Sequence, residues 1–525
     1  MSEAPTADPT LVAALRADLS GAGRDVSGVE ELLGPVAAHS LHREERVPAL
    51  RTTAAALRTG DADARTLAAL VRAFVLGAGV ARRDLERALP TLTVAGAQRA
   101  GLVTAAGEGQ DDEVRAVVDL RPYRAVDGAG TVDWWIASDL GELATGAALR
   151  TDHVLGVGGA SVMLAQVTVR DPRDRVLDLG TGCGIQALHA SRHARSVVGT
   201  DLSARALAFA RFNAQLAGLD DDRLDLRTGS MLDPVRDERF DLVVSNPPFV
   251  ITPRTPAVPA YEYRDGGRPG DDLVRDLVVG VGSVLRPGGV AQLLGNWEVR
   301  RGEEWHERVG AWLDASELDG WVVQRELLDP AQYAETWIRD GGTTADRDPD
   351  GWAERYGAWL DDFASRDVVA VGFGIVTLRR PVDADRPRLR RLEEVTGTVR
   401  QPLGPVYAAA LAAHDWLAGQ DDTALAGQRL TVAADVTEER YLTPGDEHPK
   451  VVLLRQGGGL GRAVQVGTAV AGLVGACDGE LTVGQIVAAL ARLLDTGADD
   501  VAAQVLPVVR GLVRDGLLLP VEAAR

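Results

Sequence analysis

The sequence contains few of the residues that build disulfide or metal frameworks. Its 525 residues include only two cysteines, Cys183 and Cys477, which lie far apart, and eight scattered histidines. Two distant cysteines exclude a disulfide-stapled scaffold and a cysteine-rich metal site. Because there is no HExxH motif and no Cys/His cluster, we expect no structural zinc and no other bound metal.

Long apolar runs are also missing. No stretch reaches the roughly 18 uncharged apolar residues that a membrane span requires. The first residues, MSEAPTADPTLVAAL, do not place a basic segment before a hydrophobic one, as a secretion signal does. The sequence therefore predicts a cytoplasmic protein that has no membrane partner.

Lysine is almost absent, and acidic residues outnumber basic ones by 76 to 56. The formal net charge is −20, and Lys450 is the sole lysine. A protein that holds duplex nucleic acid through general phosphate attraction needs a basic face, so this mode of binding is disfavoured. A local arginine-lined groove remains compatible with the composition.

The length predicts several domains, at about 150 residues for each. Residues 10–120 place apolar side chains at three- and four-residue spacings, which indicates helices. Within them, ARRDLERALP followed by AQRAGLVTAAGEGQDDEVRAVVDLRPYRAV resembles the two helices and hairpin of a winged helix. We expect a helical or winged-helix-like N-terminal domain over residues 1–125, either a cap that packs on its neighbour or a DNA-reading unit.

From about residue 130 short β-branched runs alternate with helical stretches, which is typical of parallel βαβ units. The pattern predicts an α/β fold with a seven-stranded, Rossmann-like domain over residues 130–382. A polar stretch rich in tryptophan separates the last two strands and indicates a helical insertion or lid. The predicted strands are 175–180, 196–202, 224–229, 240–246, 289–296, 321–327 and 368–380.

The end of the chain suggests a further small domain. Residues 380–394, RPVDADRPRLRRLEE, have the composition of a charged linker. Helical patterns near the C-terminus then indicate a small winged-helix-like domain over residues 383–525.

A glycine-rich turn joins the first predicted strand to the next helix. The run RVLDLGTGCGIQALHAS places Gly180, Gly182 and Gly184 where backbone N–H groups at a helix start can approach a ligand. Asp201 ends the following strand, where a carboxylate can bind both hydroxyls of a ribose. A tight structural turn is the alternative, but the combination favours a ligand that contains adenosine.

Asp178 narrows the choice of ligand. It lies at the end of the strand before the glycines, whereas a dinucleotide loop more often reads GxGxxG. A carboxylate in this position would repel a diphosphate and attract an ammonium or sulfonium group. The sequence therefore favours a cationic adenosine compound over a dinucleotide.

Four segments in order now show a family resemblance. VLDLGTGCGIQAL, VVGTDLSARALAFARFNAQLAGL, FDLVVSNPPFV and LRPGGVAQLL resemble the successive motifs of class I S-adenosylmethionine-dependent methyltransferases. The motif Asn-Pro-Pro-Phe at 246–249 is similar to that of the branch that methylates planar nitrogen. This branch includes release-factor glutamine methyltransferases, ribosomal RNA guanine-N2 and adenine-N6 methyltransferases, and transfer RNA and DNA adenine methyltransferases. The resemblance covers residues 130 to 380, about half of the chain.

The resemblance implies S-adenosyl-L-methionine as the cofactor. Asp178 would bind its amino group, Asp201 its ribose, and Leu202 would lie beside the adenine. Relatives often carry Gly-Asp after the third strand, whereas this chain has Gly229 followed by Ser230 and Met231. The implied cofactor-binding residues are Asp178, Gly180, Thr181, Gly182, Gly184, Asp201, Leu202, Ser230, Met231 and Asn246.

The motif at 246–249 also has a direct chemical interpretation. A planar amide or amine nitrogen is a poor nucleophile because its lone pair is conjugated. If the side-chain oxygen of Asn246 and the carbonyl of Pro247 accept its two N–H hydrogens, they orient it and favour the developing positive charge. The prolines fix the backbone, and Phe249 offers a face for stacking. The alternative is a strand-ending turn with a core phenylalanine.

Other segments are weaker candidates. Before the first strand, Gly158, Gly159 and Ser161 would add backbone contacts to the cofactor or cap a helix. The pair Trp134 and Trp135 is interpreted as core rather than as a stacking platform. Candidates for the substrate rim are Pro248, Tyr261, Arg264 and Asp265.

The sequence thus predicts an N-methyltransferase that acts on a planar nitrogen of a macromolecule, either an RNA base or a protein glutamine. One alternative is a regulatory protein that binds S-adenosylmethionine and reads nucleic acid through winged helices. Another is an enzyme that methylates a small molecule. A cofactor sensor does not need the acceptor clamp at 246–249, so the motif favours catalysis.

Overall fold

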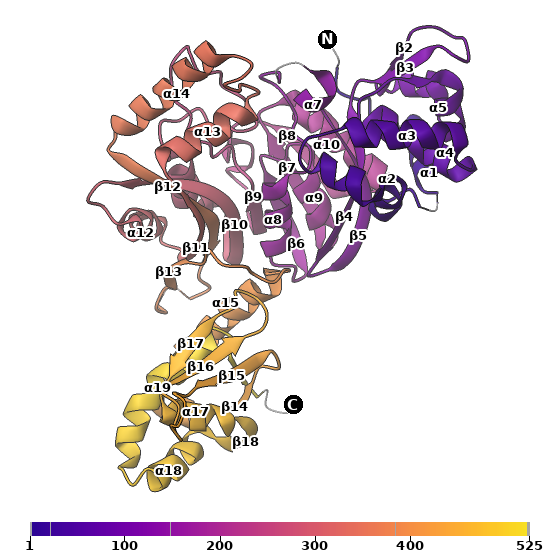
Figure 1. Ribbon diagram of the computed structural model, residues 1–525. Helices are drawn as coiled ribbons and strands as arrows, with labels where there is room; N and C mark the ends of the chain where they lie inside the picture. Colours follow the sequence, from indigo (N-terminus) through magenta and orange to yellow (C-terminus); the bar gives the residue numbers. More distant parts are fainter. Residues whose placement is uncertain (1–2, 22, 147–148, 384, 522–525) are drawn as a thin grey trace. The chain divides into compact units, whose positions relative to one another are not determined.

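The structure is a computed structural model that describes residues 3–21, 23–146, 149–383 and 385–521. It contains two compact units (Figure 1). The first consists of Met1–Ala165, Pro172–Val382 and Arg390–Glu394, and the second of Gln166–Asp171, Asp383–Leu389 and Val395–Arg525. The candidate site lies wholly in the first unit.

An eight-stranded sheet organises the first unit, in the order β13-β11-β12-β10-β9-β6-β7-β8. Its strands are β6 (Arg173–Leu179), β7 (Ala194–Asp201), β8 (Leu224–Thr228), β9 (Phe240–Ser245), β10 (Leu285–Arg300), β11 (Asp319–Leu328), β12 (Val368–Arg379) and β13 (Arg390–Glu394). The five strands β6 to β10 pair in parallel, and β12 runs antiparallel to both of its neighbours. This confirms the predicted α/β, Rossmann-like fold.

The prediction of seven strands was wrong by one. Residues 390–394, assigned to a charged linker, form β13, which pairs in parallel with β11. The charged side chains have partners at the sheet edge: Arg390 donates to the carbonyl of Leu313 at 2.8 Å, and Glu393 accepts the indole N–H of Trp321 at 2.7 Å. Because the charges are satisfied in this way, the segment forms a strand without a visible apolar pattern.

Helices cover both faces of the sheet (Figure 1). α8 (Gly159–Val167) precedes β6, and the helices α9 (Ile185–Ser191), α10 (Ala204–Ala217), α11 (Asp272–Gly280) and α12 (Trp305–Ser316) lie between successive strands. The start of α10 is capped by Ser203, whose side chain accepts the N–H of Ala206, and its end by left-handed Gly218. On one face α11 and α12 pack against an apolar layer that includes Leu177, Val243 and Leu293.

Two glycines of β12 make room for a tryptophan in this layer. A Cβ on Gly372 would lie 2.2 Å from Nε1 of Trp297, and a Cβ on Gly374 would lie 2.2 Å from the carbonyl oxygen of Val323. Trp297 is fully buried, and its indole N–H donates to Gln324 at 2.8 Å. The GFG sequence of β12 therefore reflects close packing of the sheet rather than a turn.

The N-terminal part is mostly helical. It contains α1 (Pro9–Leu19), α2 (Val26–Leu41), α3 (Val47–Thr59), α4 (Ala62–Leu70), η1 (Val71–Val75), α5 (Arg82–Ala88) and α6 (Thr93–Arg99). The strands β1 (Val80–Ala81), β2 (Val103–Ala105) and β3 (Glu113–Ala116) form a small sheet, and β4 (Asp119–Asp127) pairs with β5 (Gly130–Ser138). The order α5, α6, β2, β3 matches the predicted sequence of elements, while the winged-helix assignment stays a prediction.

Buried polar contacts join the β4–β5 hairpin to the central sheet's helices. The side chain of Asn213, in α10, accepts the N–H of Ala137 at 2.8 Å and donates to the carbonyls of Ala137 at 2.9 Å and Cys183 at 2.8 Å. In α9, His189 lies between Asp127 and Tyr123, with both contacts at 2.9 Å. Both side chains are fully buried, and apolar residues of both parts form one continuous core.

The stretch between β11 and β12 is helical, as the sequence predicts. It forms α13 (Pro330–Asp340) and α14 (Pro349–Ala364). Asp329 and Gln332 make a capping box at the start of α13. Tyr333, Trp359 and Phe363 bury their rings together against the start of β12, which holds both helices beside the sheet.

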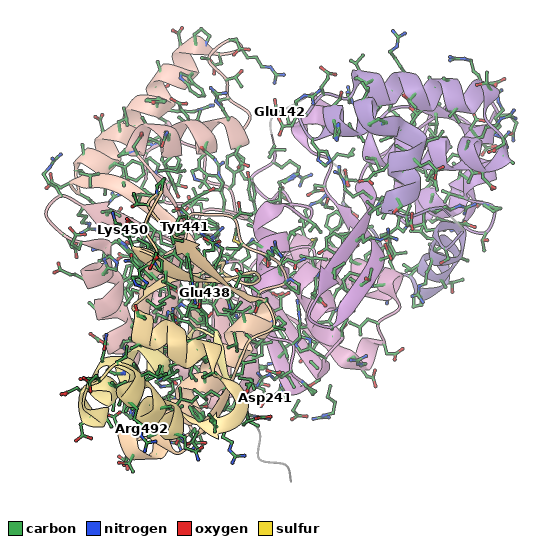
Figure 2. The ribbon with its side chains drawn as sticks, turned by 60° about the horizontal axis from the view of Figure 1, so that its bottom comes forward. Glu142, Asp241, Glu438, Tyr441, Lys450 and Arg492 are labelled. Carbon is green, nitrogen blue, oxygen red and sulfur yellow. The ribbon has the colours of Figure 1, made fainter. Side chains whose placement is uncertain are left out.

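The second unit contains two small sheets and five helices among its described residues. The sheets have the orders β18-β14-β19 and β15-β16-β17. Glu438 and Tyr441 of β15, and Lys450 before β16, belong to an antiparallel hairpin (Figure 2). The elements are α15 (Gly404–Ala418), α16 (Asp422–Ala426), β14 (Arg429–Val432), β15 (Val436–Tyr441), β16 (Val451–Gln456), β17 (Ala463–Val466), α17 (Thr468–Gly475), β18 (Asp478–Thr482), α18 (Val483–Leu493), α19 (Ala498–Arg514) and β19 (Leu518–Pro520).

The described residues contain neither a membrane-spanning helix nor a cluster of metal ligands. None of their helices is long and apolar enough to cross a membrane. Nor do they contain a group of three or more His, Cys, Asp or Glu side chains that could hold a metal ion.

Candidate active site

The glycine turn follows β6 at the carboxyl edge of the sheet, where open α/β sheets bind their ligands. Gly180, Gly182 and Gly184 have φ values of 73°, 55° and 88°, which favour glycine. Gly184 packs closely on α10, since an added Cβ would lie 3.0 Å from Cα of Ala210. Around Gly182, by contrast, no described atom lies within 4 Å of a Cβ position, so its backbone is open to a ligand.

Asp178 is held rigidly beneath this turn. One carboxylate oxygen accepts the hydroxyl of Thr181 at 2.6 Å and the N–H of Ala187 at 2.8 Å. The other, Oδ1, is buried and has no hydrogen-bond partner among the described residues. Burial raises the pKa of Asp178 to about 7, and the nearby charge of Asp201 acts in the same direction. A cationic group beside Oδ1 would relieve this cost.

Asp201 lies at the end of the neighbouring strand, β7. Its two carboxylate oxygens accept the N–H groups of Gly182 and Ser203, both at 2.9 Å. Burial raises its pKa as well. Each oxygen keeps a lone pair for a further donor, so the carboxylate can accept two hydroxyls.

The residues expected around the adenine flank Asp201. Leu202 is 67% exposed, and Ser230 is exposed too. Met231 is half-buried and has a φ of 47°, an unfavourable value for a residue with a side chain. The N–H of Gly229 donates to the carbonyl of Asp201 at 3.0 Å, which brings this loop to the cofactor edge.

The Asn-Pro-Pro-Phe motif follows β9 directly and lies beside the glycine turn. Ser245, the last residue of β9, donates its hydroxyl to the carbonyl of Leu179 at 2.7 Å. The carbonyl oxygen of Asn246 lies 4.0 Å from the Cβ position of Gly180. Within the described part of the chain, the buried Oδ1 of Asn246 has no hydrogen-bond partner. The structure therefore brings the predicted clamp and the predicted cofactor turn together.

Phe249 is fixed from two sides. Its backbone forms an isolated bridge with Asp265, and its ring lies 5.4 Å from that of Phe373 in β12, measured between centroids. Both rings are half-buried. They form an apolar wall that is partly open to solvent, as stacking on a planar group requires.

The other rim candidates have different environments. Arg264 is 4% exposed, forms an ion pair with Asp340 at 2.6 Å and lies over the ring of Tyr261, which is itself buried. These two residues fasten the loop after the motif to α13. Asp265 pairs with Arg254 at 3.2 Å, and Pro248 is half-buried beside Gly266.

The segment before β6 contacts α9 near the glycine turn. Gly158 accepts the N–H of Val162 at 3.0 Å, and the carbonyl of Ser161 accepts the side chain of Gln186 at 2.7 Å. Gly158 and Gly159 are exposed. These contacts support a role of the three residues in starting α8, and a contact with the cofactor stays a prediction.

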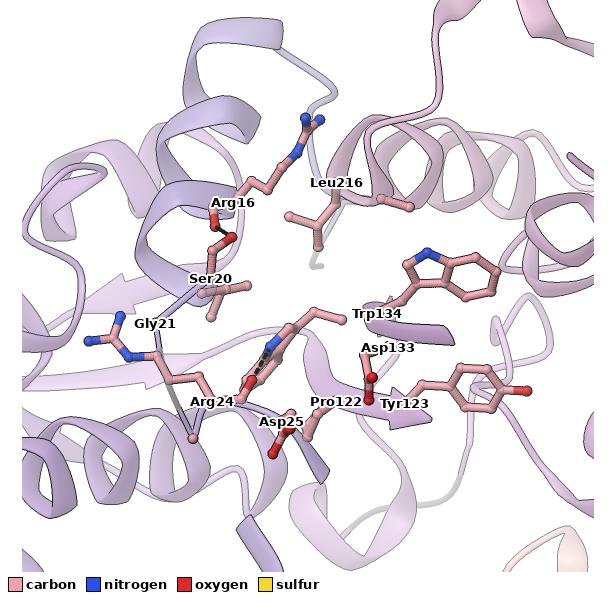
Figure 3. Close-up of a pocket in the computed structure, with 14 residues that line it drawn as sticks. Arg16, Ser20, Gly21, Arg24, Asp25, Pro122, Tyr123, Asp133, Trp134 and Leu216 are labelled. Carbon is pink, nitrogen blue, oxygen red and sulfur yellow. Dashed lines mark hydrogen bonds between the residues drawn. The ribbon is translucent and has the colours of Figure 1, made fainter. Parts of the chain in front are cut away.

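A separate pocket of about 410 Å³ lies among α1, the β4–β5 hairpin and the end of α10 (Figure 3). Trp134 lines it and packs against Tyr123, while the indole N–H of Trp135 donates to the carbonyl of Arg24 at 2.8 Å. Trp135 is 8% exposed and belongs to the core. The pocket shares no lining residue with the glycine turn or the clamp.

Sequence reasoning missed three residues beside the clamp: Asn296, Tyr333 and Phe373. Asn296 is buried at the end of an apolar run, and its Nδ2 donates to Tyr333 Oη at 2.5 Å. Tyr333 Oη also accepts the N–H of Ile251 at 3.1 Å. The polar residue that closes the apolar strand run GVAQLLGN is the signal that could have identified Asn296.

Comparison with known proteins agrees with this geometry. Residues 156–258 match a family model described as methyltransferase small domain. Residues 21–117 and 408–520 match two models described as domains of unknown function, DUF7059 and DUF7782. These two flanking matches name no ligand.

Similar curated proteins share the central part of the chain. A release factor glutamine methyltransferase of Geobacter sulfurreducens is 41% identical over 124 residues, which are 22% of this chain and 42% of that protein. The one from Moorella thermoacetica is 41% identical over 127 residues, 22% and 44% of the two chains. A ribosomal protein uL3 glutamine methyltransferase of Bradyrhizobium diazoefficiens is 32% identical over 192 residues, 34% and 59%. The chain thus spans about half the length of these relatives, and the matches confirm the resemblance indicated by the four motifs.

Proposed function

We propose that this chain transfers a methyl group from S-adenosyl-L-methionine to a planar amine or amide nitrogen of a macromolecule. The observation that carries the proposal is the buried, unpartnered Oδ1 of Asn246 beside the glycine turn. Leaving a buried acceptor unpaired costs about 1 to 3 kcal/mol. An N–H of an acceptor molecule would satisfy it.

The residues of the glycine turn fit the cofactor. Asp178 Oδ1 would pair with its ammonium group, Asp201 would accept its ribose hydroxyls, and the open backbone at Gly182 would lie along it. When bound, the cofactor supplies an electrophilic methyl group on a positively charged sulfur. The cost of burying Asp178 is thereby offset by an opposite charge.

The clamp would act on the acceptor nitrogen. Asn246 Oδ1 and the Pro247 carbonyl accept its two N–H hydrogens, and Phe249 stacks on its plane. The nitrogen lone pair forms the new N–C bond while the sulfur–carbon bond breaks and its electron pair stays on sulfur. The positively charged nitrogen then loses one proton to solvent. Orientation of the two reactants provides most of the acceleration in such a step.

The macromolecular acceptor is supported by two observations. The curated relatives described above are named for glutamine methylation of a release factor and of ribosomal protein uL3. In addition, the chain carries parts outside the match to the methyltransferase model that a small acceptor does not require. We propose the division into 1–125, 130–382 and 383–525, except that β13 (residues 390–394) belongs to the central sheet, and we propose that the flanking winged-helix-like parts position the acceptor.

Asn246→Ala provides the test. Purified protein is incubated with labelled S-adenosylmethionine and an extract of a strain that lacks the gene, and the label is then challenged with RNase or protease. We expect labelling by the unaltered protein to be lost in Asn246→Ala, with cofactor binding by calorimetry unchanged. Equal labelling by both proteins would refute the role of Asn246. Cofactor binding with no labelling of any fraction would favour a sensor.

A further inference from the structure

The backbone directly after the clamp is held by a side chain of α13. The N–H of Ile251, two residues after Phe249, donates to Tyr333 Oη at 3.1 Å. Ile251 is 1% exposed and Tyr333 is 3% exposed, so both groups are shielded from water. A buried N–H that loses its acceptor costs about 1 to 3 kcal/mol. The hydroxyl therefore determines where the peptide group of Ile251 can lie.

The same hydroxyl is tied to the central sheet. The side-chain amide of Asn296, in β10, lies 2.5 Å from Tyr333 Oη. β10 pairs with β9, the strand that ends at the clamp. The ring of Tyr333 contacts those of Trp337, Trp359 and Phe363. Tyr333 Oη is thus fixed with respect to the sheet edge that carries the glycine turn and the clamp.

The next contact of this loop leads to the same helix. Val250 donates its N–H to the carbonyl of Arg264 at 2.9 Å. The guanidinium of Arg264 donates to the carbonyl of Trp337 at 2.8 Å and pairs with Asp340 at 2.6 Å. Two successive backbone N–H groups, those of Val250 and Ile251, are therefore held by α13, one directly and one through Arg264.

These contacts bear on the clamp because few residues separate it from Ile251. If the peptide group of Ile251 turned toward another acceptor, the ring of Phe249 and the carbonyl of Pro247 would move with it. Methyl transfer requires the acceptor nitrogen to lie in line with the methyl group, and a displacement of about 1 Å can cost about 100-fold in rate. The geometry of the clamp thus depends on a hydroxyl that is itself buried.

We propose that Tyr333 is a positioning residue that fixes the clamp for in-line methyl transfer through the N–H of Ile251. This rests on the proposed function, in which Asn246, Pro247 and Phe249 hold the acceptor nitrogen. The helical insertion between β11 and β12, which supplies Tyr333, then serves catalysis as well as packing.

Hydrogen exchange tests the contact without a methylation assay. Tyr333→Phe removes the hydroxyl and keeps the ring. The matched control is Tyr356→Phe in α14, whose hydroxyl donates to Glu335 of α13 at 3.2 Å and so joins the two helices to each other. In the full-length protein, the peptide that contains Ile251 should exchange its amide hydrogens at least about tenfold faster in Tyr333→Phe and at the unaltered rate in Tyr356→Phe. Equal exchange of that peptide in all three proteins would overturn the role of Tyr333.

Kinetics then separate positioning from stability. Initial rates are measured with labelled S-adenosylmethionine and, as acceptor, increasing amounts of extract from a strain that lacks the gene. We expect Tyr333→Phe to lower kcat per cofactor-binding molecule at least about tenfold, while the Kd for the cofactor by calorimetry changes by less than about threefold. Tyr356→Phe should match the unaltered protein in both quantities.

A merely structural role gives a different result. Tyr333→Phe would then lower the thermal midpoint and the fraction of molecules that bind the cofactor, but kcat per binding molecule would be unchanged, and this would overturn the proposal. Normal labelling by Tyr333→Phe would refute only the role of Tyr333, whereas no labelling by the unaltered protein would contradict the proposed function itself.

Discussion

Ionisation of Asp178 should control cofactor affinity. Burial places the pKa of its carboxyl at about 7, against an ordinary value of 3.8. Pairing needs a carboxylate and a ligand ammonium, whose ordinary α-amino pKa is about 8. Affinity should therefore follow a bell-shaped curve with its maximum near pH 7.5. At pH 6 about one tenth of Asp178 is ionised, so binding should be roughly sixfold weaker than at the maximum, with a similar loss at pH 9.

Calorimetric titration with S-adenosylmethionine from pH 6 to pH 9 measures this curve. Asp178→Asn keeps the shape of the side chain but removes its titration, so the acidic limb should disappear and affinity at pH 7.5 should fall. Asp237→Asn, at an exposed position, is the control and should keep the bell. An acidic limb that persists in Asp178→Asn would refute the assignment of the ammonium site.

The same carboxyl should make the unliganded protein sensitive to pH. A folded pKa above the unfolded one means that folding disfavours the ionised form, so stability is lost as pH rises from about 4 to about 7. At 1.36 kcal/mol per unit, the loss is on the order of 4 kcal/mol above pH 7. Asp178→Asn should therefore raise the unfolding midpoint in denaturant at pH 8 and leave it unchanged below pH 4.

Two further pairs of substitutions, each with its own control, test the packing of the first unit. Gly374→Ala should destabilise the first unit by about 3 kcal/mol, because its Cβ would overlap the Val323 carbonyl. Its control is Gly310→Ala in α12, where no described atom outside the helix backbone lies within 4 Å of the added Cβ. This change should be neutral or stabilise the protein by up to about 1 kcal/mol. Asn213→Ala should cost about 3 kcal/mol or more because it leaves buried backbone groups unpaired, whereas Arg211→Ala, exposed on the same helix, should change stability by less than about 0.5 kcal/mol. Thermal unfolding measures both pairs, and equal midpoints within a pair would contradict the packing described.

The central sheet was predictable because its strands are marked by β-branched runs between helices. β13 was not, since Arg390 and Glu393 are bonded to partners that are distant in sequence. The ends of the longest strand were also missed: β10 runs from Leu285 to Arg300, well beyond the predicted 289–296. Residues 297–300 of its extra length pair with β12 and Leu285 pairs with Phe240 of β9, and a pairing partner is not visible in a local pattern.

The candidate site shows the same difference between residues that a local motif reveals and residues that depend on tertiary contacts. The glycine turn and the clamp are contiguous motifs whose chemistry follows from their own residues. Arg264 was expected at a substrate rim, but the structure places it against α13, whose position depends on tertiary packing. Asn296 is a single polar residue at the end of an apolar strand. Its relation to the clamp follows only from the register between β9 and β10.

The contacts of Asn213 have a consequence for how the first unit folds. One side chain joins the hairpin strand β5 and the glycine turn, and apolar side chains of both parts share one core. These parts should therefore unfold in a single cooperative transition instead of as separate modules. A shortened chain that begins after β5 would expose the apolar faces of α9 and α10 and lose the anchor of the turn, so it should aggregate rather than fold as an independent enzyme.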